Sequence, residues 1–128
     1  MNTQVVGRAI AYMLNELIVK YDYDPSQLHC VGHSLGGHVC AYAGKYAYSN
    51  WGWIMGRITG LDPAGPQFDK TATEVRLYRT DAHFVDILHT DAGNENRGFI
   101  GSELAAGHAD FYPDGGFQVK IVPLFKCL

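Results

Sequence analysis

The stretch Cys30-Val31-Gly32-His33-Ser34-Leu35-Gly36-Gly37-His38 decides the fold of this chain of 128 residues. It contains a Gly-x-Ser-x-Gly pattern in which Ser34 stands between Gly32 and Gly36. The apolar residues before the pattern predict a buried strand, and the alanine-rich run 35–47 predicts a helix. A serine on a tight turn from a strand into a helix is the context that a nucleophile elbow requires.

The two glycines have a steric role in this interpretation. A serine turned outward on so sharp a bend takes a strained backbone conformation, which crowds the residues two before and two after it. We therefore expect both Gly32 and Gly36 to be required because they lack Cβ. The bend also sets Ser34 at a helix N-terminus, which favours a developing oxyanion, with the amide of Leu35 as the first donor. The alternative is a chance occurrence of five residues.

Length and composition restrict the class of protein. The length predicts one domain, and 47% hydrophobic residues suffice for a core. A net charge of −3 without a basic block argues against nucleic acid as a partner. No apolar run is long enough to predict a membrane-spanning helix. Cys30, Cys40 and Cys127 lack metal-like spacing. We expect Cys30 and Cys40 to be small buried apolar residues and Cys127 to pair outside the chain.

The remaining pattern alternates helices and strands, which predicts a mostly parallel sheet with crossover helices. The predicted elements are a helix at 5–20, a strand at 27–31, a helix at 35–48, strands at 54–61, 75–78 and 84–89, a long loop at 90–107 and a turn at 111–116. In the first helix, apolar residues recur at spacings of three and four: Val6, Ile10, Met13, Leu14 and Leu17. No strand precedes this helix, although an elbow strand is normally central, so we expect an incomplete domain.

A serine nucleophile requires a base and an acid that orients the base. Asp62 follows the predicted strand 54–61, so it is expected at the same sheet edge as Ser34. The alternative for Asp62 is an ordinary Asp-Pro turn. Three histidines come later in the chain, His83, His89 and His108. Of these, His108 after the long loop is the strongest candidate base, although a single histidine is more often structural.

Four ordered motifs, VGHSLGGHVCAYAGK, GRITGLDPAGPQF, FVDILHTDAG and GHADFYPDGGFQ, resemble the animal neutral lipase family. That family includes pancreatic-type lipases, lipoprotein-type lipases and secreted phospholipases that cleave the first acyl position. The resemblance covers about residues 2–118, and the tail 119–128 does not match. It implies that residues 1–128 form a partial α/β-hydrolase fold with a nucleophile elbow, lacking N-terminal strands and the C-terminal part.

The resemblance also implies roles for individual residues. Ser34 is expected as the nucleophile, Asp62 as the triad acid and Leu35 as an oxyanion donor. The family's catalytic histidine lies beyond the Gly-Gly turn, where nothing in this chain matches it, so His108 is expected to be structural and the isolated chain nearly inactive. The implied reaction is hydrolysis of acyl esters of glycerolipids, either triglyceride or phospholipid, at a membrane or lipoprotein surface outside the cell.

Two alternatives to a lipase remain at this point. One is a non-catalytic lipid-binding or yolk-type storage relative, and the other is a fragment that does not fold stably. Some relatives bind a structural calcium after the triad acid, through backbone carbonyls and two aspartates. Asp81 matches one of these aspartates, but Tyr78 stands at the other position, so we expect neither a metal nor any other cofactor.

Overall fold

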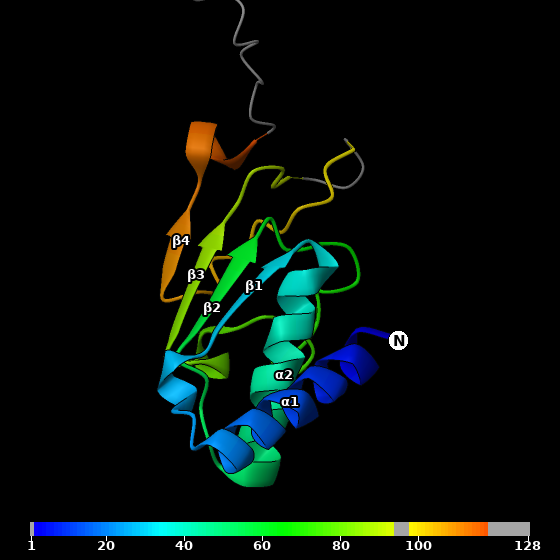
Figure 1. Ribbon diagram of the computed structural model, residues 1–128. Helices are drawn as coiled ribbons and strands as arrows, with labels where there is room; N and C mark the ends of the chain where they lie inside the picture. Colours follow the sequence, from blue (N-terminus) through cyan, green and yellow to red (C-terminus); the bar gives the residue numbers. More distant parts are fainter. Residues whose placement is uncertain (1, 94–97, 118–128) are drawn as a thin grey trace, which may run out of the picture.

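The computed structural model describes residues 2–93 and 98–117, which form a parallel sheet covered by two helices (Figure 1). This confirms a partial α/β fold. The helices are α1 (Asn2–Tyr21) and α2 (Leu35–Trp51), and the strands are β1 (His29–His33), β2 (Arg57–Leu61), β3 (Phe84–Leu88) and β4 (Ala109–Phe111). Short 3-10 helices occupy Pro25–Gln27, Arg79–Asp81 and Pro113–Gly116.

The register of the sheet brings the candidate site together. The strands lie in the order β1-β2-β3-β4, and all neighbours are parallel. The last residues of the four strands are aligned with one another: His33, Leu61, Leu88 and Phe111. The residues that follow β1, β2 and β3, which are Ser34, Asp62 and His89, therefore share the carboxyl edge of the sheet.

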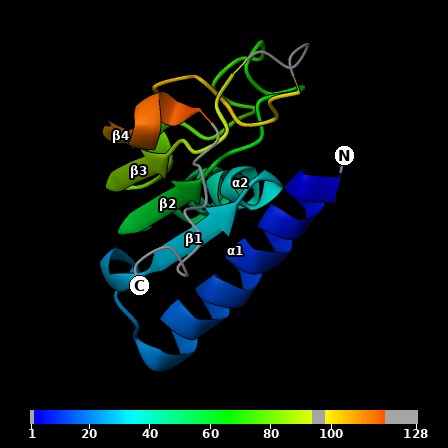
Figure 2. The same ribbon diagram turned by 90° about the horizontal axis from the view of Figure 1, so that it is seen from above.

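Small residues set the distance between the layers. Helix α2 packs against β1 and β2 through a buried alanine-rich face, and α1 packs against α2 (Figure 2). A Cβ on Gly44 would lie 2.2 Å from the carbonyl oxygen of Asp81, and one on Gly7 would lie 2.6 Å from Cβ of Tyr42. Both glycines are therefore fixed by close packing rather than by backbone conformation. Within the described residues, no helix combines the length and hydropathy needed to cross a membrane.

Helix α1 forms as its periodicity predicts, but only part of the predicted apolar face is buried. Ile10 and Leu14 pack against the core, whereas Val6, Met13 and Leu17 are exposed. The fully buried residues are the small ones, Thr3, Gly7 and Ala11, because close approach of two helices favours small side chains.

Two strands differ from the prediction. Strand β4 was not predicted, because three residues are too few for a strand periodicity to be recognised in the sequence. No strand forms at residues 75–78, because the chain there turns into a 3-10 helix. The backbone N–H of Tyr78 donates to Oδ2 of Asp81 at 2.9 Å, which fixes the start of that helix.

A disulfide joins Cys30 in β1 to Cys40 in α2. The two residues were expected to be small buried apolar residues. Both do pack in the core, but the expectation did not include the bond between them. The bend at the elbow folds α2 back along β1, and this brings the two Cα atoms to 5.9 Å, within the range that a disulfide spans. The bond therefore connects the strand and the helix on either side of Ser34. Cys127 lies outside the described residues.

Removing this disulfide is expected to destabilise the chain. Because the bond closes a loop between residues ten apart, its loss in a Cys30→Ala/Cys40→Ala variant should cost about 3 kcal/mol of unfolding free energy. Urea unfolding in a Cys127→Ala background measures this, and added reductant should lower the midpoint of the parent but not of the variant. Equal midpoints for parent and variant would exclude a stabilising disulfide.

Candidate active site

Ser34 occupies a strained turn between β1 and α2. Its φ of 54° and ψ of −120° lie outside the regions that a serine ordinarily adopts. Its backbone N–H donates to the carbonyl oxygen of Leu61 at 2.9 Å, which ties the turn to β2. The residue is half-buried at the head of the helix. This geometry is that of a serine held outward on an elbow.

The crowding at the elbow falls on one glycine only. A Cβ on Gly32 would lie 2.2 Å from the carbonyl oxygen of Gly36, so Gly32 has no room for a side chain. A Cβ on Gly36 would meet nothing within 4 Å. The expectation that both glycines are sterically required is therefore wrong for Gly36. The carbonyl of Gly36 approaches β1, whereas its own Cβ position faces open space.

The N-terminus of α2 offers free hydrogen-bond donors beside Ser34. The N–H of Gly37 donates to the carbonyl oxygen of Ser34 at 3.2 Å, but the amides of Leu35 and Gly36 find no acceptor in the part of the chain that the structure describes. Free amides at the positive end of a helix dipole stabilise an anion. The amide of Leu35 is therefore available to an oxyanion formed next to Ser34.

A cavity of about 560 Å³ opens beside Ser34. Its apolar lining residues are Leu35, Ala64, Pro66, Phe68 and Ile100, and its polar ones are Asn2, Thr3, Ser34 and Gln67. The volume is in the range of ligand pockets. Predominantly apolar walls with a serine among them suit an ester that carries a hydrocarbon chain.

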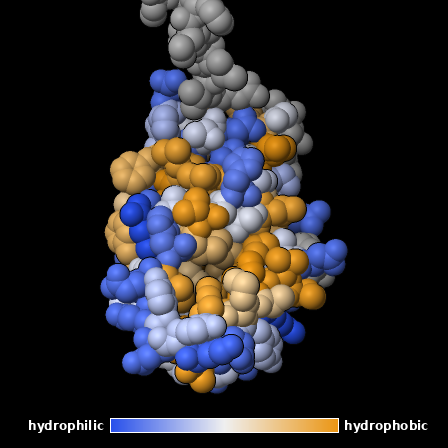
Figure 3. Space-filling view, viewed as in Figure 1, coloured by the Kyte–Doolittle hydropathy of each residue, from blue (hydrophilic) through white to orange (hydrophobic). Residues whose placement is uncertain are grey.

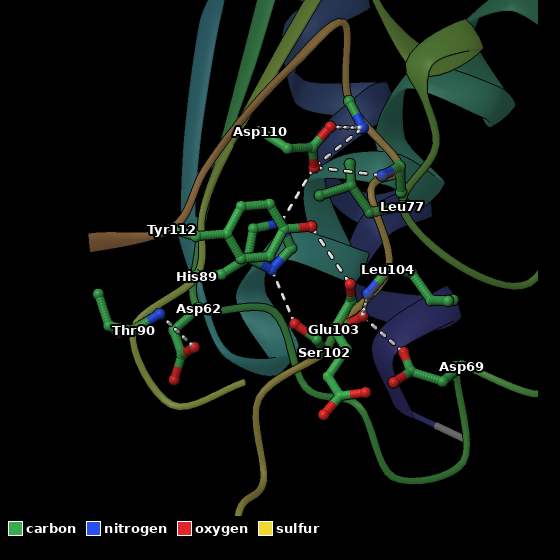
Figure 4. A network of polar contacts seen from close by, with 12 residues as sticks. Asp62, Asp69, Leu77, His89, Thr90, Ser102, Glu103, Leu104, Asp110 and Tyr112 are labelled. Atoms are coloured by element: carbon green, nitrogen blue, oxygen red, sulfur yellow. Dashed lines mark hydrogen bonds and ion pairs between the residues drawn. The ribbon is translucent and has the colours of Figure 1, made fainter. Parts of the chain in front are cut away.

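Asp62 follows β2 directly, and its carboxylate is held from one side. Its N–H donates to the carbonyl oxygen of Leu88 at 2.7 Å. Oδ1 accepts the backbone N–H of Thr90 at 3.0 Å (Figure 4). It also accepts the backbone N–H of Asp91 at 2.9 Å. Gly101 packs so closely that a Cβ there would lie 2.4 Å from Oδ1. Among residues 2–93 and 98–117, no hydrogen bond reaches Oδ2, so this oxygen remains available to a partner.

Ser34 and Asp62 lie at the ends of adjacent strands. His33 pairs with Leu61 in the register of β1 and β2, and each candidate residue comes one position later. The sequence placed both at one sheet edge, and the structure brings them there. A base between a serine and an oriented carboxylate is the arrangement of an acyl-transfer triad.

Two of the three candidate bases lie at the wrong end of the sheet. His83 precedes β3, and His108 precedes β4, so both are at the amino edge. The backbone N–H of His108 donates to the carbonyl oxygen of Val85 at 2.7 Å, and its Nδ1 accepts the N–H of Val85 at 3.0 Å. His108 therefore has a structural contact far from Ser34, as the family resemblance implied.

The third candidate, His89, lies at the correct edge but is enclosed. The residue has no exposed surface. Its Nδ1 is 2.7 Å from the carbonyl oxygen of Ser102, and its Nε2 is 3.0 Å from Oδ1 of Asp110 (Figure 4). Both nitrogens are engaged, so the ring has none free to take a proton from Ser34. The described residues therefore supply a candidate nucleophile and acid without the base.

A fourth histidine, His38, supports the cavity wall and was not singled out from the sequence. Its Nδ1 accepts the N–H of Leu77 at 3.1 Å, its Nε2 donates to the carbonyl oxygen of Ala64 at 2.9 Å, and its ring stacks on Phe68 at 3.6 Å. Burial lowers the pKa of His38 below its ordinary value. The signal in the sequence was its spacing, four residues after Ser34 on the same face of α2.

The possible calcium position holds an ammonium instead. Oδ1 of Asp81 pairs with Nζ of Lys45, and Oδ2 accepts the N–H of Tyr78 at 2.9 Å. Tyr78 contributes no carboxylate, and the described residues contain no group of three or more His, Cys, Asp or Glu side chains that fits a metal. Calcium requires six or more oxygen ligands, so the residues present do not fit it.

The ion pair between Lys45 and Asp81 should make stability depend on pH. Burial raises the pKa of Asp81 from 3.8 to about 6, and Lys45 opposes this. A raised acid pKa means that the contribution of Asp81 is fully present below its unfolded value and is lost as pH rises through about 6. Because Lys45 favours only the ionised carboxylate, Lys45→Met should cost about 3 kcal/mol near pH 8 and almost nothing near pH 4.

Chemical unfolding at both pH values tests this dependence. The exposed Lys70 provides the matched control, because Lys70→Met removes the same charge without removing a buried partner. A loss in Lys45→Met that is equal at the two pH values would mean that lost packing, rather than the charge on Asp81, explains it.

Comparison with known proteins identifies the family to which this elbow and its neighbouring carboxylate belong. The sequence model of the family named Lipase matches residues 1–123. This chain belongs to the Lipase family. It is 45% identical to pancreatic lipase-related protein 3 of Homo sapiens over 98% of this chain and 27% of that protein.

Two further relatives bear on activity. The chain is 49% identical to pancreatic triacylglycerol lipase of Cavia porcellus over 92% of this chain and 25% of that protein. It is 48% identical to inactive pancreatic lipase-related protein 1 of Canis lupus familiaris over 92% of this chain and 24% of that protein. This chain thus spans about a quarter of the length of these relatives. Its identity to the relative named inactive, 48%, is close to its identity to the relative named a triacylglycerol lipase, 49%.

Proposed function

We propose that this chain is the part of a lipase catalytic domain that carries the nucleophile and the acid of a serine triad. The reaction is hydrolysis of acyl esters of glycerolipids. The observation that carries the proposal is the strained Ser34 at a free helix N-terminus, adjacent to Asp62 at the end of the next parallel strand. Strained backbone at such a position is typical of catalytic sites.

In the proposed reaction, Oγ of Ser34 attacks the ester carbonyl carbon while a histidine outside the described residues accepts its proton. The free Oδ2 of Asp62 accepts the other N–H of that histidine. The amide of Leu35 donates to the tetrahedral oxyanion. The carbon–oxygen bond to the alcohol then breaks, and the alcohol leaves with the proton from histidine. Water attacks the acyl-serine by the same steps in reverse, which releases the fatty acid.

The cavity beside Ser34 supports a lipid substrate. Its apolar walls, including Phe68 and Ile100, suit an acyl chain, and a relative is named a triacylglycerol lipase. Apolar patches lie among polar side chains on the face shown in Figure 3, as expected for a protein that works at a membrane or lipoprotein surface. The disulfide between Cys30 and Cys40 supports an extracellular location, where such bonds persist. No cofactor is required by this chemistry.

Asp62→Asn tests whether the carboxylate of Asp62 orients the catalytic base, because the substitution keeps the hydrogen bonds from the backbone to this side chain. The amide oxygen can still accept the N–H groups of Thr90 and Asp91, but an NH₂ group replaces Oδ2 and presents the wrong partner to the base. In a hybrid lipase that supplies the rest of the domain, we expect kcat to fall by about four orders of magnitude with little change in stability. Asp22→Asn, at an exposed residue with a positive φ that asparagine tolerates, is the matched control. A loss of less than tenfold for Asp62→Asn would remove Asp62 from the triad.

A second candidate function is a non-catalytic lipid-binding relative. Two observations favour it: no base stands beside Ser34 among the described residues, and one close relative is named inactive. Such a protein would bind lipid in the cavity without turnover. The intact pair of Ser34 and Asp62 favours the enzyme.

A hybrid lipase tests the proposal. In this hybrid, residues 2–117 replace the matching stretch of the pancreatic triacylglycerol lipase of Cavia porcellus, which supplies the rest of the domain. We expect the hybrid to hydrolyse emulsified triacylglycerol. The isolated chain should be nearly inactive, because no base stands beside Ser34 among the described residues. A folded hybrid that binds lipid without turnover would favour the second candidate.

A further inference from the structure

The ring of His89 faces an acceptor at each nitrogen (Figure 4). The carbonyl oxygen of Ser102, 2.7 Å from Nδ1, has no proton to donate, so the Nδ1 contact requires a proton on Nδ1. The Nε2 contact at 3.0 Å is to Oδ1 of Asp110. This second contact requires a proton on Nε2 unless Asp110 is itself protonated.

The surroundings of Asp110 indicate that its carboxylate is ionised. Oδ1 also accepts the backbone N–H of Ala106 at 3.2 Å, and Oδ2 accepts the N–H of Gly107 at 3.1 Å. Backbone N–H groups that donate to both oxygens favour the ionised carboxylate as their acceptor. An ionised carboxylate leaves both protons on the ring.

We propose that His89 is a buried imidazolium, paired with Asp110, that acts as a positioning residue for Asp62. The charge is enclosed without exposed surface and is stabilised by the ion pair. The ring of Tyr112 stacks on it at 4.2 Å, which adds a contact between a cation and an aromatic face.

Other charged groups lie around this ring. The hydroxyl of Ser102 donates to Oδ1 of Asp69 at 2.6 Å. A second carboxylate is therefore connected to the ring through Ser102, whose carbonyl oxygen contacts Nδ1 of His89. His38 and Arg76 line the same small cavity as His89, and the neutral hydrogen-bonding pattern of His38 adds no charge. The ring thus contacts the carboxylate of Asp110, and the carboxylate of Asp69 and the guanidinium of Arg76 line the same small cavity.

The ring connects the two segments that hold Asp62. On one side, Thr90 and Asp91 follow His89 directly and donate to Oδ1 of Asp62. On the other side, Ser102 accepts from the ring through its carbonyl and donates its N–H to the carbonyl of Pro63 at 2.8 Å. A ring fixed at both nitrogens therefore holds in place both segments that contact Asp62 and its neighbour Pro63.

The inference deepens the proposed role of Asp62 and rests on that proposal only for its link to catalysis. The state of the ring is tested without any turnover, by NMR of the full chain with ¹⁵N-labelled histidine near pH 7. We expect both nitrogens of His89 to show the shifts of protonated nitrogens. His38 is the internal control, because its Nδ1 accepts an N–H and must show the shift of an unprotonated nitrogen. An unprotonated nitrogen in His89 would overturn the proposal.

A pair of variants tests the positioning role by hydrogen exchange. In His89→Gln, the amides of Thr90 and Asp91 should exchange about tenfold faster or more, since their acceptor is no longer held in place. In His108→Gln, which removes a hydrogen-bonded histidine at the opposite edge, both rates should stay unchanged. Asp110→Asn should convert the ring of His89 to a neutral form. Unchanged exchange in His89→Gln, or a doubly protonated ring in Asp110→Asn, would contradict the proposal even if Ser34 proves catalytic.

Discussion

Ser34→Ala in the hybrid lipase is expected to lower the rate of triacylglycerol hydrolysis by about four to six orders of magnitude. The reason is the position of Ser34 at this edge of the sheet. Among residues 2–93 and 98–117, it is the residue that combines an outward backbone bend, a free helix N-terminus and a carboxylate on the adjacent strand. Removing the hydroxyl leaves only the oxyanion donor and substrate binding, which retain a small part of the acceleration.

The measurement compares initial rates on emulsified triacylglycerol at saturating substrate. Ser49→Ala is the matched control, because Ser49 lies on the same helix, exposed, with its hydroxyl bonded to the carbonyl of Tyr46. That variant should keep the parent rate. A Ser34→Ala variant within a hundredfold of the parent would show that another residue attacks the ester.

Gly32→Ala is expected to destabilise the chain by about 4 kcal/mol or more, near the upper end of effects for single substitutions. The new Cβ would lie 2.2 Å from the carbonyl oxygen of Gly36 and 2.6 Å from the amide nitrogen of Gly37. Both are backbone atoms, so no side chain can rotate away. Relief requires β1 and α2 to separate, and the disulfide between Cys30 and Cys40 resists that movement.

Gly36→Ala provides the matched control two residues beyond Ser34. Its Cβ meets nothing within 4 Å, and alanine is favoured over glycine in a helix by about 1 kcal/mol. We expect this variant to be as stable as the parent or slightly more stable in urea unfolding. Equal losses for the two variants would mean that the elbow is crowded on both sides, contrary to the structure.

The sequence predicted the parts of the fold that depend on local pattern. The elbow motif, the helical periodicity of residues 2–21 and the apolar runs of β2 and β3 each gave an element near its true position. Parallel connectivity then predicted that Ser34 and Asp62 lie at one edge of the sheet. The lipase resemblance agreed with both residues.

The features that the sequence did not predict depend on contacts between distant segments. The disulfide requires knowing that α2 folds back along β1, and the different roles of Gly32 and Gly36 require the direction of each Cβ. Likewise, the sequence pattern favoured His108 over His89 as the candidate base. Only the sheet shows that His89 is enclosed at the carboxyl edge and that His108 lies at the amino edge.

The most direct test of the central claim is to locate the acyl acceptor. The hybrid lipase is incubated with diethyl p-nitrophenyl phosphate, whose phosphorus takes the place of the ester carbonyl carbon, and the modified peptide is identified by mass spectrometry. The account predicts one diethyl phosphoryl group on Ser34, with release of one nitrophenolate and complete loss of turnover. Complete loss of turnover with the label on a different residue, and with Ser34 unmodified, would contradict it.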